Sequence, residues 1–176
     1  MSDIVLNTNE LRRKIPTLKA GDRVFLSGAV YTARDAAHAK LMELIDNKKP
    51  LPFDIKDSAI YYAGPTEAPP GRAVGSCGPT TSGRMDCFSP ALLDRGLCCM
   101  IGKGARSKAV IDSIIKNKAV YLCAIGGAGA LAAKCITSLE VIAFPELGCE
   151  SIKKLEFNNF PLIVGIDCKG NSIFEK

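Results

Sequence analysis

Short apolar runs of strand length alternate along the chain with segments in which apolar residues recur at helical spacing. The apolar runs predict strands over 23–27, 58–63, 97–101, 119–125 and 139–144. The first strand is expected to end at Gly28, and the tail, 155–174, to form strands joined by a turn at 169–171. The amphipathic segments predict helices over 32–46, 89–96 and 107–118, with a short helix opening at 126–132. This mixture of consecutive strands and strand–helix units predicts a compact α/β domain of mixed sheets.

The predicted helix over 32–46 carries a cation where a helix dipole disfavours one. Thr32 is expected to be the N-cap, with Asp35 at capping-box spacing, which places Arg34 in the first turn. A cation there costs roughly 0.3 to 1 kcal/mol at an exposed site, but an anion bound to the free amides and Arg34 would make the cation favourable. The alternative is that Arg34 pairs with Asp35 or with a neighbouring loop. His38, the only histidine, follows one turn later and is expected to be a hydrogen-bonded supporting residue.

A stretch rich in hydroxyls follows a long irregular segment. Residues 64–76 are rich in proline and glycine, and long loops of this kind inside compact domains are usually functional or disordered. They lead into Gly78-Pro79-Thr80-Thr81-Ser82-Gly83-Arg84-Met85-Asp86. If a helical turn follows the proline, Thr80 and Arg84 emerge on one face, where a planar fork beside a hydroxyl suits a carboxylate or phosphate. The alternative is a capped loop in which the hydroxyls bond backbone amides and Arg84 pairs with Asp86.

Two glycine-rich segments follow predicted strands. Gly102-Lys103-Gly104 presents an ammonium at the carboxyl end of a strand, where open α/β sheets bind ligands, but it lacks the rest of a nucleotide phosphate loop. Residues 126–132 contain the Gly-x-Gly-x-x-Ala of the dinucleotide fingerprint, and Glu146 follows the next strand. A stand-alone dinucleotide-binding module built on Gly127-Ala128-Gly129 is therefore the alternative from another class of function. Close packing of a helix start explains these glycines as well.

Composition narrows the choice of partners. The 176 residues carry a formal net charge of +5 from scattered lysines and arginines, without a basic block, which argues against nucleic acid. The excess of positive charge fits an anionic small substrate, and it fits an ordinary solvated surface as well. No apolar run approaches the roughly 20 residues of a membrane helix, and the N-terminus lacks the pattern of a signal peptide. We therefore expect a soluble cytoplasmic protein that does not bind membranes.

The cysteines do not follow a metal-binding pattern. Eight are present, and no two form a Cys-x-x-Cys motif: Cys77, Cys87, Cys98, Cys99, Cys123, Cys135, Cys149 and Cys168. Zinc and ordinary iron–sulfur ligation by this chain are therefore poorly supported, and we expect no metal ligands in it. Most of the cysteines are expected to be small buried residues with free thiols.

Four motifs, taken in order, resemble those of a known family. They are 28–38 (Gly-Ala-Val-Tyr-Thr-Ala-Arg-Asp-Ala-Ala-His), 62–65 (Tyr-Ala-Gly-Pro), 78–86 and 100–104 (Met-Ile-Gly-Lys-Gly). Together they resemble the β subunit of the iron–sulfur hydro-lyases, the family of class I fumarase and L-tartrate dehydratase. The resemblance runs over 21–165, and its most specific part is the Thr-Thr-Ser-x-Arg-Met-Asp run.

The resemblance implies a fold, an assembly and a reaction. The expected fold is a swivelling β/β/α domain of three layers that takes up residues 1–176 as a single domain. The expected partner is an α subunit that holds a 4Fe-4S cluster on three cysteines of its own, in an α2β2 assembly. The expected reaction is the reversible hydration of fumarate to L-malate, with the dehydration of L-tartrate as the alternative.

The resemblance also assigns roles to residues. Arg34, Arg84 and Lys103 correspond to a clamp on the two carboxylates of the substrate, and Thr80 to the residue that exchanges the proton on carbon. Such a reaction needs both carboxylates fixed and a proton moved at one carbon. A threonine hydroxyl is a weak base at neutral pH, and the activating aspartate of the family belongs to the α part, so this chain alone is expected to be inactive. The supporting residues of the site are expected to be His38, Asp35, Thr81 and Asp86.

Overall fold

A computed structural model describes residues 3–174 as a mixed α/β fold with one sheet of seven strands. The strands are β1 (Ile4–Asn7), β2 (Arg23–Thr32), β3 (Ala59–Tyr61), β4 (Cys99–Gly102), β5 (Val120–Cys123), β6 (Ile136–Ala143) and β7 (Ile152–Ile166). The α-helices are α1 (Leu11–Lys14), α2 (Asp35–Asp46), α3 (Ser89–Leu93), α4 (Lys108–Asn117) and α5 (Gly129–Lys134). Short 3-10 helices are η1 (Thr8–Glu10), η2 (Ile15–Thr17), η3 (Ser82–Met85) and η4 (Pro145–Glu150). The predicted α/β class is confirmed, but the described strands form a single sheet.

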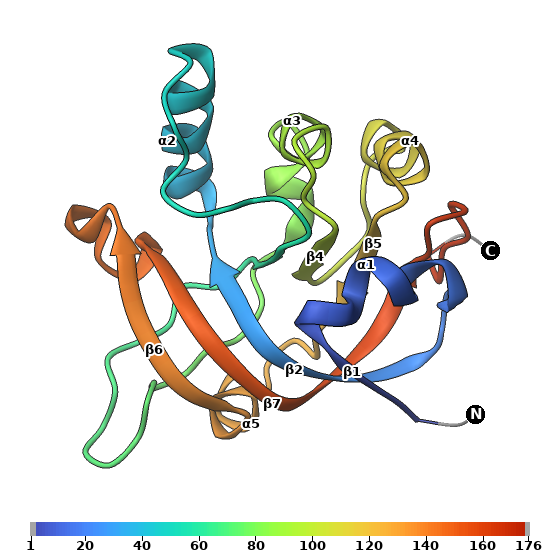
Figure 1. Ribbon diagram of the computed structural model, residues 1–176. Coiled ribbons are helices and arrows are strands. Elements are labelled where there is room, and N and C mark those ends of the chain that lie inside the picture. The colour runs from blue at the N-terminus through green and yellow to red at the C-terminus, as the bar shows by residue number, and fades with distance from the viewer. Residues whose placement is uncertain (1–2, 175–176) are drawn as a thin grey trace.

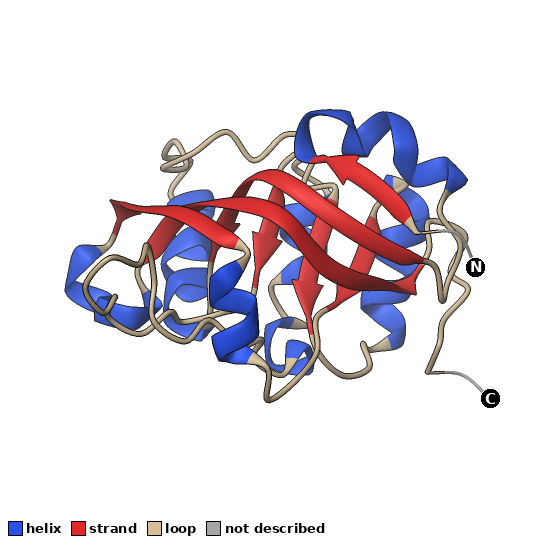
Figure 2. Ribbon diagram, turned by 90° about the horizontal axis from the view of Figure 1, so that it is seen from below, coloured by secondary structure: helices blue, strands red, loops and turns tan. Residues whose placement is uncertain are grey.

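The sheet combines a parallel half with an antiparallel half. Strands β1 to β5 pair in sequence order, and every pair among them is parallel. Strand β7 runs antiparallel to β5, to β6 and also to β2. The pairing therefore runs from β2 through β3, β4, β5 and β7 back to β2, so the sheet curls into a closed ring (Figure 2).

The curled sheet separates two hydrophobic cores. Neighbouring residues on a strand point to opposite faces, and both faces are buried here: Tyr61 and Ile101 belong to one core, and Ile60 and Met100 to the other. The second core lies between the sheet and helices α2, α3 and α4, which stand side by side over one face (Figure 1). Burial on both faces explains why these strands read as continuous apolar runs.

The first predicted strand is longer than the sequence pattern indicated. Strand β2 passes through Gly28, where the expectation of a strand end was wrong, and continues to Thr32. Gly28 has a φ of +105° and lies where the register with β7 shifts, as at a β-bulge. The glycine therefore bends the strand and does not terminate it.

The expected N-cap of α2 was also wrong. Thr32 ends β2, and its hydroxyl donates to the Ser151 carbonyl (3.3 Å) and accepts from the Lys153 amide (3.1 Å). The helix begins at Asp35, with Arg34 in the N-cap position. Thr32 is engaged by a strand distant in sequence, so it cannot serve the helix end.

The glycines at 126–132 do not open a dinucleotide-binding unit. That fingerprint needs the strand after the helix to lie parallel to the strand before it in one βαβ unit, but β7 lies between β5 and β6 and is antiparallel to both. Helix α5 has only six residues. The tail also differs from its prediction, because β7 is one long strand, and the turn after it closes with a single bridge between Ile166 and Ser172.

Over residues 3–174, the helices are too short or too polar for any of them to cross a bilayer.

Gly102, the last residue of β4, tests the close packing at the strand ends. A Cβ there would overlap the Ser82 hydroxyl and lie 2.9 Å from the Tyr62 ring. We expect Gly102→Ala to lower the free energy of unfolding by about 1–3 kcal/mol, measured by urea denaturation. Gly83→Ala is the control, because its nearest neighbour would be 3.9 Å away, and it should change stability by less than about 0.5 kcal/mol. Equal losses in both variants would contradict this account.

Candidate anion-binding site

The segments singled out from the sequence meet at one edge of the parallel half of the sheet. Strands β2, β3, β4 and β5 are parallel neighbours, so their carboxyl ends lie side by side. The chain leaves these ends at 33–35, 62–64, 103–104 and 124–126. In open α/β sheets and in closed α/β barrels alike, ligands bind at the carboxyl ends of the parallel strands.

The hydroxyl-rich stretch lies across the ends of β3 and β4. The Thr80 amide donates to the Tyr62 carbonyl (2.6 Å), and the Ser82 amide donates to the Lys103 carbonyl (2.9 Å). Thr81 and Lys103 also form a parallel bridge. The expected helical turn exists as η3, but it begins at Ser82, so Thr80 precedes it. These backbone contacts bring Thr80 and Lys103 to the same edge of the sheet.

Arg84 pairs with Asp35 and not with Asp86. Its Nε and Nη2 donate to the two Asp35 carboxylate oxygens at 2.9 and 2.8 Å. This two-pronged geometry is the strong form of an arginine–carboxylate contact. The alternative sequence interpretation, a local pair between Arg84 and Asp86, is wrong. The contact also ties η3 to the first turn of α2.

Arg34 lies beside the loop that follows β6. Its Nε is 3.2 Å from Glu150 Oε1, although this buried nitrogen has no well-aligned hydrogen bond among the described residues. The side chain packs on Gly64, where a Cβ would lie 2.9 Å from Nη1. Of the two pairings expected for Arg34, with Asp35 or with a neighbouring loop, the structure contains the pairing with the loop. The sequence did not reveal Glu150 as its partner.

Lys103 and Thr80 keep their functional groups uncommitted. Among residues 3–174, neither the Lys103 ammonium nor the Thr80 hydroxyl takes part in a side-chain hydrogen bond, and the ammonium forms no ion pair there. The lysine stem packs against Gly126, where a Cβ would lie 3.4 Å from Cδ. Both groups are half-buried. An ammonium and a hydroxyl in this state can bind a ligand without first breaking an internal contact.

Asp86 supports the site from below through a buried arginine. Arg106 Nε donates to Asp86 Oδ1 (2.7 Å), its Nη2 donates to Ser89 Oγ (2.7 Å), and the guanidinium stacks on the Tyr62 and Tyr121 rings. Asp86 is therefore engaged with the core and does not face a ligand directly. Arg106 escaped the sequence analysis because a charged residue after a glycine-rich loop reads as exposed, whereas its side chain is fully buried.

His38 is a buried neutral group behind Arg34. Its Nδ1 donates to the Arg34 carbonyl (2.9 Å), while Nε2 is buried without a partner among the described residues. The ring lies between Tyr62 and Phe88. Burial lowers the pKa of His38 from 6.5 to about 4. The expected hydrogen-bonded histidine is thus present, and it fixes the backbone at the start of α2.

All the cysteines have free thiols, and they differ in how far they are buried. Three are buried, three are half-buried and two are exposed, so the expectation that most are buried was wrong. Among residues 3–174, no group of three or more histidine, cysteine, aspartate or glutamate side chains gathers closely enough to hold a metal ion. An iron–sulfur cluster does not fit the residues described.

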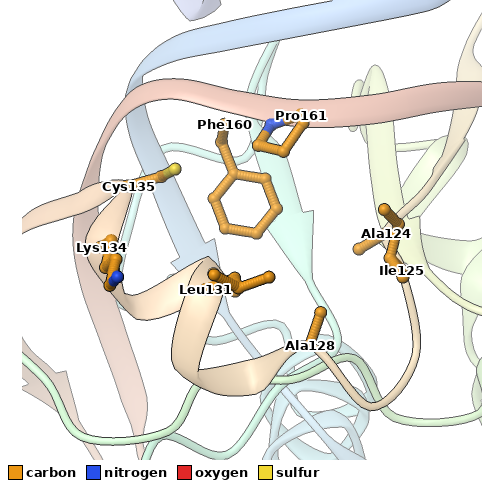
Figure 3. A pocket seen from close by; sticks show the side chains of 9 residues that line it. Ala124, Ile125, Ala128, Leu131, Lys134, Cys135, Phe160 and Pro161 are labelled. Carbon is orange, nitrogen blue, oxygen red and sulfur yellow. The ribbon is translucent and has the colours of Figure 1, made fainter.

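An apolar cleft lies next to the site, between α5 and β7. It measures about 340 Å³, and the Phe160 ring and the Leu131 side chain face its interior (Figure 3). Ile125 and Leu131 are both 64 % exposed. One wall is the 124–129 segment, which also packs on Lys103 at Gly126 and on Gly78 at Gly129. The cleft and the candidate site therefore share one segment of chain.

Arg34 and Lys103 thus lie at the carboxyl ends of β2 and β4 in an α/β fold, and Arg84 contacts Asp35 beside Arg34. The whole chain, 1–176, matches the family described as Fumarase C-terminus. The chain belongs to this family.

Its relatives carry the names of two related enzymes. Fumarate hydratase 2 of Leishmania major is 43 % identical over 176 residues, and the anaerobic class I fumarate hydratase of Escherichia coli K12 is 45 % identical over 169 residues. These matches take in 99 % and 95 % of this chain but only 31 % of each relative, so the chain spans about a third of their length. The L(+)-tartrate dehydratase subunit beta of Escherichia coli K12 is 33 % identical over 174 residues, with 96 % of this chain and 85 % of that subunit covered. The chain thus corresponds to the small β-subunit type.

The neutral state of His38 makes an acid-sensitivity prediction. The unfolded chain takes up this proton near pH 6.5, whereas the folded protein resists it down to about pH 4. Stability from this residue is therefore complete above pH 6.5 and is lost as the pH falls towards 4. We expect His38→Gln to be less stable than the wild type at about pH 7.5, with the difference shrinking at about pH 4.5. Urea midpoints at both pH values measure this, and an equal deficit at both would refute it.

Proposed function

We propose that this chain is the β component of an iron–sulfur hydro-lyase that hydrates fumarate reversibly to L-malate. The proposal is supported by the attachment of Arg34, Lys103 and Thr80 to neighbouring strand ends, and by the contact of Arg84 with Asp35 beside Arg34. A dicarboxylate offers two planar anionic groups, and planar guanidinium forks are suited to such groups. Family membership with the fumarate hydratases supports the same assignment.

The residues of this chain bind, orient and exchange a proton. Arg34, Arg84 and Lys103 hold the two carboxylates of the substrate and fix the position of the carbons between them. Charge builds beside a carboxylate when a proton leaves the neighbouring carbon, and the cations stabilise it. Thr80 exchanges that proton, with its backbone fixed by the Tyr62 carbonyl. A threonine hydroxyl needs an activating base, which we place on the partner.

In this proposal, the hydroxyl group that is added to or removed from the substrate is bound by the partner and not by this chain. The described residues offer no set of ligands for a cluster, so we assign the 4Fe-4S cluster to an α subunit, in an α2β2 assembly. We also assign the swivelling three-layer β/β/α character of the family to this chain, which would let it close over the cluster-bearing part. On this basis the isolated chain is inactive.

L-tartrate dehydration is the second candidate activity, because a tartrate dehydratase β subunit is among the relatives and matches along most of its length. Fumarate and tartrate differ in hydroxyl substituents that a carboxylate clamp does not contact. A dinucleotide-binding role for Gly127-Ala128-Gly129 is not favoured, because β6 does not lie beside β5 in parallel.

An anaerobic pull-down with this chain as bait, from its native extract, tests the proposal. We expect capture of a larger chain that carries iron, and hydration of fumarate by the captured complex but by neither chain alone. Iron analysis and a fumarate assay provide the readouts, with L-tartrate as the second substrate. Fumarate hydration by the iron-free bait alone would contradict the split site.

Two substitutions separate binding from proton exchange in the assembled enzyme. Arg84→Lys keeps the charge but loses the planar fork, so we expect KM to rise and kcat to fall. Thr80→Ala removes the exchanging hydroxyl, and we expect kcat to fall by about 100-fold or more with KM nearly unchanged. Wild-type kinetics for Arg84→Lys would remove it from the site. Equal losses in kcat and binding for Thr80→Ala would point to a structural role for that hydroxyl.

The apolar cleft beside the site is the surface we assign to the α subunit. The fumarate hydratases have roughly two-thirds of their length outside the matched region, and 31 % inside it. A partner that binds next to Lys103 is expected to contact the 124–129 segment, because Gly126 of this segment packs against the Lys103 side chain. The exposed side chains of Ile125, in this segment, and Leu131, in α5, line the apolar cleft. Apolar surface of this kind is characteristic of protein interfaces.

Leu131→Asp tests this assignment. The side chain is 64 % exposed, so stability should change little, but a carboxylate in the apolar cleft should weaken capture of the larger chain at least about tenfold. Val5→Asp on β1, where the side chain is 69 % exposed, is the matched control. Titrated capture of the larger chain measures both variants. If they bind equally, the partner docks elsewhere.

A further inference from the structure

Two carboxylates of this chain hold the two arginines of the proposed clamp. Asp35 binds Arg84, and Glu150 lies against Arg34. Arg34 and Asp35 are consecutive, so both contacts meet at the N-terminus of α2. They connect η3 on one side of the helix end with η4 on the other.

Arg84 is held along one edge of its guanidinium. Nε and Nη2 point at Asp35, which uses two of the five donors of the side chain. Among residues 3–174, Nη1 and the second hydrogen of Nη2 have no hydrogen-bond partner, so both stay available on the outer edge. The Arg84 side chain is 52 % exposed, so without Asp35 the guanidinium would be free to rotate in solvent.

Arg34 is approached along the corresponding edge. Glu150 Oε1 lies 3.2 Å from Nε, and that nitrogen is shielded from solvent. Gly64 lets the other side of the guanidinium lie close to the backbone. The side chains of Arg34 and Glu150 are 24 % and 25 % exposed. Arg34 is therefore more deeply buried than Arg84, whereas Arg84 has the better-aligned hydrogen bonds.

The loop that carries Glu150 is itself fixed by a buried ammonium. Lys153 Nζ donates to the carbonyls of Gly148 and Cys149 (both 3.0 Å) and to Ser151 Oγ (2.7 Å). The residue is 6 % exposed, and burial lowers its pKa. These contacts hold the backbone on both sides of Glu150, so its carboxylate has a defined direction.

We propose that Glu150 and Asp35 are positioning residues, which fix the free edges of Arg34 and Arg84 in the directions that the two substrate carboxylates require. The inference rests on the proposed function. Both carboxylates also cancel part of the clamp's positive charge, so an anion is recognised by hydrogen-bond geometry more than by net charge. A planar dicarboxylate of the right span is then preferred over other anions.

Kinetics of the assembled enzyme distinguish positioning from charge. If Glu150 only reduces the attraction for anions, Glu150→Gln should lower KM. If it positions Arg34, the same change should raise KM for fumarate about tenfold and lower kcat less. Asp35→Asn should act likewise through Arg84. The matched control is Glu146→Gln in the same η4 segment, where the carboxylate binds Lys40 and not an arginine, and it should behave as the wild type.

Nuclear magnetic resonance of the full chain gives a readout that does not depend on activity. The Nε–H groups of Arg34 and Arg84 should show slow solvent exchange, and Arg34→Lys and Arg84→Lys assign the two signals. We expect Glu150→Gln, or Glu150→Ala if the amide oxygen substitutes, to speed exchange at Arg34 only. Asp35→Asn should speed exchange at Arg84 only. A general loss of structure would move both signals together in every variant.

The two readouts separate the possible failures. Selective exchange at each arginine together with a raised KM supports the inference in full. Selective exchange with a wild-type assembly that is inactive on fumarate and tartrate supports the positioning and overturns the proposed function. An active assembly in which Glu150→Gln and Glu150→Ala keep or lower KM, or a chain in which neither exchange rate responds, overturns the inference.

Discussion

The antiparallel pairing of β7 with both β2 and β5 is the constraint on which the rest of the structure depends. Strand β7 pairs with β2 over 154–163 and with β5 over 163–166, so it closes the ring formed by β2, β3, β4, β5 and β7. The parallel strands β3, β4 and β5 are thereby enclosed, and both of their faces are buried. Their carboxyl ends are forced into one compact edge. Arg34, Thr80 and Lys103 of the candidate site are attached to that edge.

Charge at this edge is organised by contacts between loops distant in sequence. Arg84 binds the carboxylate of Asp35, 49 positions away in the sequence. Arg34 lies against the carboxylate of Glu150, which belongs to the loop after β6. Arg106 and Asp86 form a further ion pair, and the Arg106 guanidinium stacks on the rings of Tyr62 and Tyr121. A buried guanidinium is costly unless it is paired and hydrogen-bonded, and Arg106 meets both conditions. The packing of Arg106 in the core therefore fixes the position of Asp86, two residues after Arg84.

The distribution of free and engaged groups is consistent with a site completed by another protein. Lys103 and Thr80 keep their functional groups uncommitted among the described residues, whereas the two arginines are held by carboxylates of the same chain. The apolar cleft adjoins the loop that flanks Lys103. The same segment, 124–129, thus contacts the Lys103 side chain and lines the apolar cleft.

The sequence by itself determined the α/β class, most of the strands and helices, and the segments proposed to form the candidate site. Apolar runs bounded by glycine and proline are local signals, and motifs such as 78–86 are contiguous, so both can be read along the chain. Only the tertiary structure decided the single closed sheet, the engagement of Thr32 by the Ser151–Lys153 segment, and the pairing of Arg34 with Glu150 and of Arg84 with Asp35. Each of these contacts joins residues far apart in sequence, and local periodicity carries no information about such partners. The bulge at Gly28 shows the same limit, because a glycine that ends a strand and one that bends it look alike until the opposing strand is known.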